Sequence, residues 1–450
     1  MLFKPHAYQI RAIDFVLRTP YCALFMDMGL GKSIVTLTAI NRLMNDSLDV
    51  DRVLVVAPKS VAQNTWSNEA GKWDHCRHLR LSLVMGTAAQ RTAALDADAD
   101  IYVTNRDNVV WLVRECLDHR KAWPFDCVVL DESSSFKNYS SKRWKALWRA
   151  RPLIRRMVLL TGTPAPNGLM DLWSQVKLLD NGARLGAYIT QFRQRWFHPG
   201  AHNGAVVYEY VPNKGAREDI SARISDICLS MQASDYLDMP KVIDGGVDLQ
   251  LPELRQYRKF EKDCVMDLRD GSEILAVTAV SLANKLMQFT GGAVYDDEHS
   301  WHEVSTAKME ALLDILEATS EPVLVYYNYI HERERICAQV PDAVCFKGEP
   351  DILTAWNDGR IRVLLCHPAS VAYGLNMQQG GHIIVWYSPT WNLELYQQAN
   401  ARLLRQGQTK PVVIYHLVCK DTMDETVMGA LRRKDDTQDA ILQHIKSLTK

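Results

Sequence analysis

The residues best placed to do chemistry lie in one short stretch near the start of the 450-residue sequence. Tyr21–Phe25 is an apolar run typical of a buried strand, and Gly29 and Gly31 then free the backbone to curl. Lys32 and Ser33 follow and open a helix. In such a turn backbone N–H groups bind phosphate oxygens, the lysine ammonium reaches the outer phosphates, and the serine hydroxyl can ligate Mg²⁺.

The stretch departs at one position from the general phosphate-binding pattern G-x-x-x-x-G-K-S. Met26 stands where the first glycine is expected. Taken alone, Gly-Lys-Ser after an apolar run is equally consistent with an ordinary strand-to-helix turn. The choice between the two depends on residues further along the chain.

A pair of acids is the first of these partners. Cys127–Leu130 is predicted to be a buried strand, and Asp131 and Glu132 follow at its end. Beside a phosphate site, an aspartate at a neighbouring strand end can hold the Mg²⁺ shell while the next glutamate deprotonates the attacking water. Without that site the two acids are a solvated turn.

Two further sets of polar side chains could serve a nucleotide. The amide of Gln9, in an amphipathic N-terminal segment, suits the edge of adenine, or else belongs to a solvated helix face. In the predicted helix Trp391–Arg405, three residues fall at i, i+4 and i+7, namely Gln398, Arg402 and Arg405. Such a stripe could deliver an arginine to a transferring phosphate, or lie idle on the surface.

Basic residues gather where a polyanion could bind. Ser141–Arg156 contains seven Lys or Arg and no acid, and is either a basic helix face or a solvated helix whose tryptophans pack inward. A Pro-Lys-Ser turn after the predicted strand Val53–Ala57 could hold a backbone phosphate, or be a plain turn. The residues that we expect at such a surface are Lys59, Ser60, Arg149 and Arg151.

The elements that position these residues form two series of strand, loop and helix, which predicts an α/β fold with parallel sheets. The rhythm breaks between Arg184 and Arg223, in a segment of mixed basic and aromatic residues, and resumes near Val323. We expect a first lobe over 1–183, a protrusion and linker over 184–240, and a second lobe over 241–450.

Composition narrows the class of protein. With 47% apolar and 23% charged residues the chain is an ordinary globular protein, and its net charge of −1 leaves any binding of polyanions to local patches. The ten cysteines include no C-x-x-C pair that would indicate zinc. No signal peptide or apolar run of membrane length is visible, so we expect a cytoplasmic protein without membrane contact.

Taken in order, these motifs resemble those of the Swi/Snf-type DNA translocases of helicase superfamily two. Residues 27–33 are similar to the family's D-E-M-G-L-G-K-T, and residues 131–138 to its D-E-A-H-x-x-K-N. Residues 160–173 resemble L-T-G-T-P-x-x-N-x-x-x-E-L-W, and residues 391–408 resemble W-N-P-x-x-x-x-Q-A-x-x-R-x-x-R-x-G-Q. The resemblance extends over residues 8 to about 425.

The resemblance implies two RecA-like lobes of the P-loop NTPase and helicase-core type, with a short inserted protrusion, that clamp ATP and Mg²⁺ and hold a DNA duplex. Members of the family hydrolyse ATP to move along double-stranded DNA, usually without separating its strands. We therefore expect a monomeric, DNA-dependent ATPase acting on intact, forked or branched duplexes in DNA remodelling, replication, recombination or repair, in a bacterial or phage-infected cell.

The resemblance also implies roles for single residues. The nucleotide and metal would be bound by Gln9, Gly29, Gly31, Lys32, Ser33 and Asp131. Catalysis would use Glu132 as general base and Arg405 as arginine finger, supported by Arg402 and Gln398. Coupling of nucleotide state to lobe motion would use Thr161 and Thr163. The family contacts the DNA backbone or the nucleotide at positions matching Lys59, Thr104, Asn105, Gly374 and Asn376.

The sequence departs from the family at three places. Ser133 and Ser134 replace Ala-His after the acidic pair, His367–Asn376 lacks the usual glycine pair, and Cys228–Met231 replaces an arginine-rich segment. The compact insertion most resembles small bacterial, phage and annealing-helicase-like branches.

Two alternatives remain at this point, a strand-separating helicase on DNA or RNA and an ATP-binding scaffold without turnover. The complete catalytic set disfavours the scaffold. The Q-A-x-x-R-x-x-R-x-G-Q match and the lack of room for a separating wedge disfavour the helicase.

Overall fold

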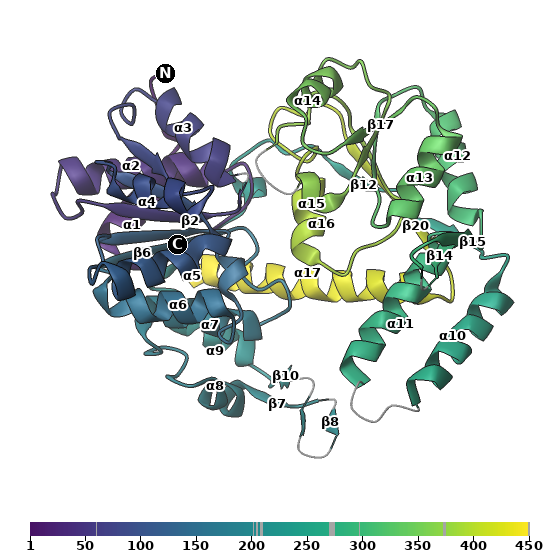
Figure 1. Ribbon diagram of the computed structural model, residues 1–450, viewed down its shortest axis with the longest axis horizontal. Helices are drawn as coiled ribbons and strands as arrows, with labels where there is room; N and C mark the ends of the chain where they lie inside the picture. The colour runs from purple at the N-terminus through teal and green to yellow at the C-terminus, as the bar shows by residue number, and fades with distance from the viewer. Residues whose placement is uncertain are drawn as a thin grey trace. The chain divides into compact units, whose positions relative to one another are not determined.

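The computed structural model describes residues 1–59, 61–200, 202–203, 206–207, 210–269, 275–296, 298–371 and 375–448. The chain divides into two compact units, Met1–Leu237 with Lys434–Lys450, and Asp238–Arg433 (Figure 1). Within the described ranges each unit contains one seven-stranded sheet whose strands pair in parallel. The predicted α/β fold with two parallel sheets is confirmed.

The sheet of the first unit has the strand order β11-β1-β6-β5-β2-β4-β3. Apart from Tyr21 at the start of β1, the residues of its central strands are buried, as in parallel strands covered by helices on both faces. The strands are β1 (Tyr21–Met26), β2 (Val53–Ala57), β3 (Leu81–Leu83), β4 (Ile101–Asn105), β5 (Cys127–Asp131), β6 (Arg156–Thr161) and β11 (Cys228–Met231).

The pairing of these strands brings the predicted motifs to one edge of the sheet. Strand β6 lies between β1 and β5, with Thr161 paired to Phe25 and Leu160 paired to Asp131. Since all three strands are parallel, the turns that follow them emerge side by side. The segments after Met26, Asp131 and Thr161 are therefore neighbours, although about 100 residues separate the first two in the chain.

Helices of the first unit connect and cover the strands. Helix α1 packs beside α2, and α5 beside α6. The helices are α1 (Ala7–Arg18), α2 (Lys32–Asn45), α3 (Trp66–Lys72), α4 (Ala88–Asp96), α5 (Val109–Arg114), α6 (Lys142–Ala150), α7 (Met170–Asp180), α8 (Ile189–Trp196) and α9 (Ala216–Ile224).

The segment expected to be a separate protrusion is largely part of the first unit. Phe192, Trp196 and Phe197 are buried in that unit's apolar core, and the chain then returns to the sheet through α9 and β11. The described part of the insertion also contains short strands, namely β7 (Phe197–Pro199), β8 (His202–Asn203), β9 (Val206–Val207) and β10 (Tyr210–Pro212). Phe192, Trp196 and Phe197 thus serve packing, and the boundary between units falls after Leu237.

The sheet of the second unit has the order β12-β20-β19-β16-β18-β17, and β13 also pairs with β20. A hairpin of β14 (Ala293–Tyr295) and β15 (Trp301–Glu303) follows two long helices. The sheet strands are β12 (Val242–Asp244), β13 (Val247–Leu249), β16 (Val323–Tyr326), β17 (Ala343–Phe346), β18 (Val363–Cys366), β19 (Ile383–Trp386) and β20 (Val412–Cys419). The helices are α10 (Leu254–Arg269), α11 (Leu275–Thr290), α12 (Ala307–Ala318), α13 (Ile330–Gln339), α14 (Pro350–Asn357), α15 (Pro368–Val371), α16 (Leu393–Asn400) and α17 (Met423–Leu448).

Two expectations about the end of the chain need correction. The helix predicted over Trp391–Arg405 ends at Asn400, where the backbone tightens and Leu403 N–H bonds to the Asn400 carbonyl. The last part of α17 belongs to the first unit, because Leu442 is buried in that unit's core. Across the described ranges, no helix combines the length and the apolar character that spanning a bilayer would need.

Candidate active site

The phosphate-binding stretch forms a tight loop between β1 and α2. Gly29 and Gly31 have φ angles of 86° and 80°, in the left-handed region that favours glycine, and Gly31 caps the helix that Lys32 begins. The Lys32 ammonium donates to the carbonyls of Met26 (2.8 Å) and Asp27 (3.2 Å). The lysine is thus held over its own loop, where a phosphate could take the place of these carbonyls.

The missing first glycine has a structural reason. Met26 is the last residue of β1, fully buried and paired with Met231 of β11, so it lies in the strand and not in the loop. No left-handed backbone is needed there. The candidate phosphate loop therefore begins after Met26.

Gln9 lies directly against this loop. Its Nε2 donates to the Leu30 carbonyl at 3.3 Å, and its Oε1 accepts from the backbone N–H of His6 at 3.0 Å. A Cβ atom at Gly31 would approach the Gln9 amide to 2.8 Å, so the close packing requires glycine. Gln9 thus ties α1 to the phosphate loop; its reading of adenine stays a prediction.

Asp131 is buried at the end of β5. Its Oδ2 accepts from the indole Nε1 of Trp66 at 3.0 Å. Burial raises the pKa of Asp131, while the Trp66 bond and the nearby positive charge of Lys32 act against that rise. The positive charge of Lys32 thus acts on the carboxylate of Asp131. The bond from Trp66 could not be predicted, because in the sequence Trp66 was only an apolar residue of an amphipathic helix.

The donor set fits Mg²⁺. This ion is usually bound by one or two carboxylates together with waters and substrate phosphates. Asp131 offers a carboxylate with only one oxygen engaged by Trp66, and Ser33 offers a hydroxyl in the first turn of α2. These two residues would hold the ion, which would neutralise phosphate charge when bound.

Glu132 has an unusual backbone. Its φ of 54° lies in the left-handed region, which costs a residue with a side chain about 1–2 kcal/mol and occurs at functional sites. The Thr161 hydroxyl donates to Glu132 Oε2 at 3.3 Å, and Thr163 N–H donates in turn to that hydroxyl at 3.0 Å. The carboxylate is therefore connected to the Thr-Gly-Thr-Pro turn.

That turn also approaches the phosphate loop. A Cβ atom at Gly162 would lie 3.3 Å from the Met26 carbonyl and 3.7 Å from Cα of Asp27. A side chain there would push the two turns apart. Thr161 and Thr163, predicted as coupling residues, thus lie between the phosphate loop and the acidic pair.

In the second unit the two predicted arginines converge on one carbonyl. Arg402 Nη1 and Arg405 Nη1 donate to the Leu375 oxygen at 2.9 and 3.2 Å, and Arg402 Nε donates to the Gln398 carbonyl at 2.9 Å. Burial lowers the pKa of Arg405, which still remains charged near neutral pH because a guanidinium titrates far above it. Gln398 is fully buried and donates to Glu394 at 3.2 Å.

Two predicted nucleotide contacts, Gly374 and Asn376, precede these arginines in the sequence. Asn376 is exposed and its carbonyl accepts from Asn357 Nδ2 at 2.9 Å. Gly374 lies outside the described residues. Leu375, the residue before Asn376, is thus bonded through its carbonyl to both arginines.

The predicted nucleic-acid contacts separate into exposed and buried groups. Lys59 is exposed, and Ser60 lies outside the described residues. Thr104 is fully buried and donates to the Val84 carbonyl at 2.8 Å, while Asn105 is 8% exposed. Arg149 is paired with Asp118 at 2.6 Å on the surface.

Arg151 does not lie on a binding surface, contrary to the expectation. It is 4% exposed, donates to the carbonyls of Leu178 and Leu179 at the end of α7, and its guanidinium stacks on the Tyr21 ring. A buried guanidinium whose donors are taken by carbonyls cannot reach a phosphate. Within the basic segment Ser141–Arg156, Arg151 therefore serves packing and not binding. Trp144 is buried, and its ring is stacked on that of Trp148 with the ring centroids 5.2 Å apart.

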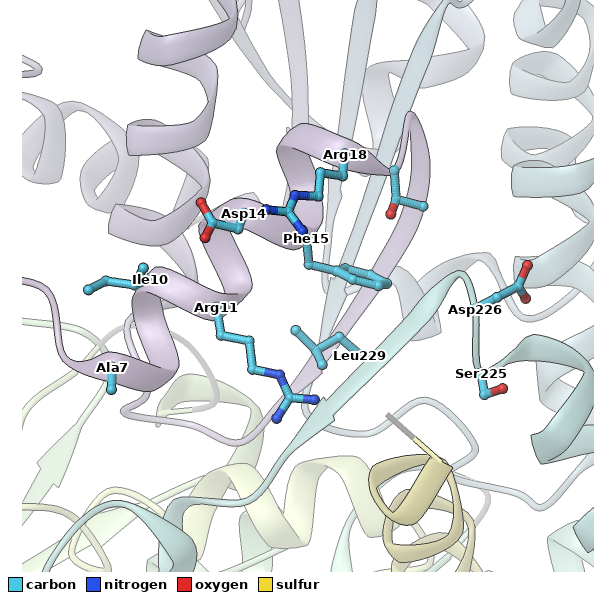
Figure 2. Close-up of a pocket in the computed structure, with 10 residues that line it drawn as sticks. Ala7, Ile10, Arg11, Asp14, Phe15, Arg18, Ser225, Asp226 and Leu229 are labelled. Carbon is cyan, nitrogen blue, oxygen red and sulfur yellow. The ribbon is translucent and has the colours of Figure 1, made fainter. Parts of the chain in front are cut away.

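A hollow on the surface of the first unit lies away from this site. It has a volume of about 690 Å³ and lies on the outer face of α1, with Arg11 and Phe15 turned toward Leu229 of β11 (Figure 2). Gln9 is on the other, buried face of α1. The hollow is therefore separate from the phosphate loop.

Several known proteins are similar to this chain in sequence. Residues 8–228 match the SNF2-related domain. The chain is 38% identical to the putative protein p41 of Acyrthosiphon pisum secondary endosymbiont phage 1, over 99% of both chains. It is 25% identical to the DNA repair and recombination protein RAD54-like of Danio rerio, over 90% of this chain and 62% of that protein.

A solved structure is also similar, the Sulfolobus solfataricus SWI2/SNF2 ATPase core in complex with dsDNA. The TM-score is 0.46 and the identity 21%, over 100% of this chain and 97% of the other. An uncharacterized ATP-dependent helicase of Mycoplasma genitalium is 22% identical over 91% of this chain, which spans only 39% of that helicase.

Proposed function

We propose that this chain, which belongs to the SNF2-related, Swi/Snf-type family of helicase superfamily two, is a DNA-stimulated ATPase that moves along double-stranded DNA. The observation that carries the proposal is the meeting of three turns at one sheet edge. The phosphate loop, the acidic pair and the Thr-Gly-Thr-Pro turn follow β1, β5 and β6, and the charge of Lys32 acts on Asp131.

Each residue has a distinct part in hydrolysis. Lys32 and the backbone N–H groups of the loop bind the outer phosphates. Ser33 and Asp131 would hold Mg²⁺, which would supply neutralisation of phosphate charge. Glu132 accepts a proton from the attacking water. Arg405 stabilises the charge that develops on the transferring phosphoryl group, with Arg402 fixing its orientation through the shared Leu375 carbonyl.

Duplex DNA is the proposed track because a relative named for DNA repair and recombination aligns with 90% of this chain, at 25% identity. A motor that passes every sequence must bind the phosphate backbone and not base edges, so its affinity should fall steeply with salt and vary little with sequence. Lys59, which is exposed after β2, is a proposed contact. The strand-separating helicase remains the second candidate, favoured by the likeness to an ATP-dependent helicase.

The rate of ATP hydrolysis tests the proposal. It is measured without nucleic acid and with duplex DNA, single-stranded DNA or RNA. We expect duplex DNA to raise kcat most, and Arg405→Ala to remove most of the rate, by about 10³-fold or more. Equal rates with and without DNA, or a parental rate for Arg405→Ala, would contradict the proposal.

A further inference from the structure

Ser133, the residue after the catalytic acids, makes a contact that the family motif does not supply. Its side chain is fully buried, and its Oγ donates to Oε1 of Gln175 at 2.8 Å. The matching family position is alanine, which has no hydroxyl. The contact is therefore particular to chains that, like this one, carry a hydroxyl here and an amide on α7.

Gln175 extends this contact to the Thr-Gly-Thr-Pro turn. Its Nε2 donates to the carbonyl of Pro164 at 2.7 Å and to that of Asp171 at 3.0 Å, and its side chain is 1% exposed. Asp171 in turn accepts from the backbone N–H of Asn167 at 2.8 Å. One buried amide thus joins the segment after β5 to the segment after β6.

The buried setting makes this link stiff. A buried amide that loses a partner retains an unsatisfied polar group at a cost of about 1–3 kcal/mol, so the three bonds of Gln175 persist together. A displacement of Pro164 must then displace Ser133 or break a bond. Ser133 is the next residue to Glu132, whose left-handed backbone depends on its surroundings.

The neighbouring serine supplies a contrast. Ser134 stands where the family has histidine, and it is also fully buried, yet its Oγ has no hydrogen-bond partner among the described residues. The family's histidine contact therefore has no replacement at that position. Within the described part of the motif, the hydroxyl that connects the acidic pair to α7 is that of Ser133.

We propose that Ser133 and Gln175 are positioning residues. Through them the position of the Thr-Gly-Thr-Pro turn determines the position of the Glu132 backbone, and thereby of its carboxylate. The inference rests on the proposed function, because it assigns to this pair the transmission from bound DNA to hydrolysis. The pair contacts neither substrate nor metal. It acts through the Glu132 backbone, in parallel with the direct bond from Thr161 to the Glu132 carboxylate.

The test compares Gln175→Met, Ser133→Ala and the double variant with the parent, and uses Ser134→Ala as the matched control. Gln175→Met keeps the side-chain volume, and Ser134→Ala removes a hydroxyl that makes no bond. For each protein one measures kcat and KM for ATP with and without duplex DNA, together with the unfolding midpoint.

We expect the ratio of DNA-stimulated to DNA-free kcat to fall about tenfold in both single variants, as the loss of one buried hydrogen bond would predict. KM for ATP should stay within about twofold, and the double variant should lose no more than either single one. Ser134→Ala should match the parent.

A ratio within about twofold of the parent in both single variants would overturn the inference alone. So would an equal loss in Ser134→Ala, because a hydroxyl without a hydrogen-bond partner would then matter as much as that of Ser133. A parent whose rate no nucleic acid raises would overturn the proposed function, and this inference with it.

Discussion

Replacing Trp66 by phenylalanine should weaken metal-dependent hydrolysis, because the indole is the one described hydrogen-bond donor from a side chain to Asp131. A hydrogen bond to a charged group is worth about 1.5–3 kcal/mol. Without it the pKa of Asp131, already raised by burial, moves further toward neutral pH, and the protonated carboxyl cannot ligate Mg²⁺. The energy corresponds to an increase of about ten- to a hundredfold in the Mg²⁺ concentration for half-maximal rate.

Trp356 offers a matched control in the second unit. It is also fully buried, and its Nε1 donates to a neutral partner, the Met377 carbonyl, at 2.9 Å. Both Trp→Phe variants should lower the unfolding midpoint, but only Trp66→Phe should shift the Mg²⁺ titration. The shift should be larger at lower pH, since the carboxyl ionises again as pH rises. Parental Mg²⁺ and pH dependence in Trp66→Phe would refute the reasoning.

Three further outcomes follow from the structure. Glu132→Gln should bind a fluorescent ATP analogue with parental affinity while its turnover falls by about 10³-fold, because only the general base is lost; parental turnover would exclude that role. Arg151→Ala should lower the free energy of unfolding in urea by about 2–4 kcal/mol, since two buried carbonyls lose their donor, while Arg149→Ala, at an exposed pair, should leave the midpoint nearly unchanged; similar effects of both would contradict the burial argument. Burial and neighbouring aspartates raise the pKa of Asp439 to about 6. The folded chain therefore binds the proton of this carboxyl more tightly than the unfolded chain does. The protonated carboxyl contributes stability at low pH, and this contribution is lost as pH rises through about 6. Between about pH 5 and pH 7.5 the melting temperature of Asp439→Asn should therefore fall less than that of the parent.

Strands that are unbroken apolar runs could be predicted from the sequence, and very short or partly polar strands could not. Val53–Ala57 and Val363–Cys366 have the bounds that their unbroken apolar runs predict. Strand β3 has three residues, too few to show any period. Strand β11 contains a buried serine, Ser230, so its run of four residues did not indicate a strand, and its place at the sheet edge depends on pairing with the distant β1.

The motifs located the site, but its supporting contacts depend on tertiary structure. Nothing in the sequence shows that Trp66 reaches Asp131 or that Gln175 reaches Ser133, because 65 and 42 residues separate the partners. The burial of Arg151 could not be predicted, because the sequence does not distinguish an arginine that binds helix-end carbonyls from its exposed basic neighbours. The helical spacing of Gln398, Arg402 and Arg405 continued past the point where the helix ends.

Displacement of a third strand from a DNA triplex tests the central claim most directly, because a motor that moves along an intact duplex strips the third strand ahead of it. The parent should displace that strand with ATP and Mg²⁺, should fail to do so as Lys32→Ala, and should leave a forked duplex largely paired. Robust separation of the fork together with no triplex displacement would contradict the translocase and favour the helicase.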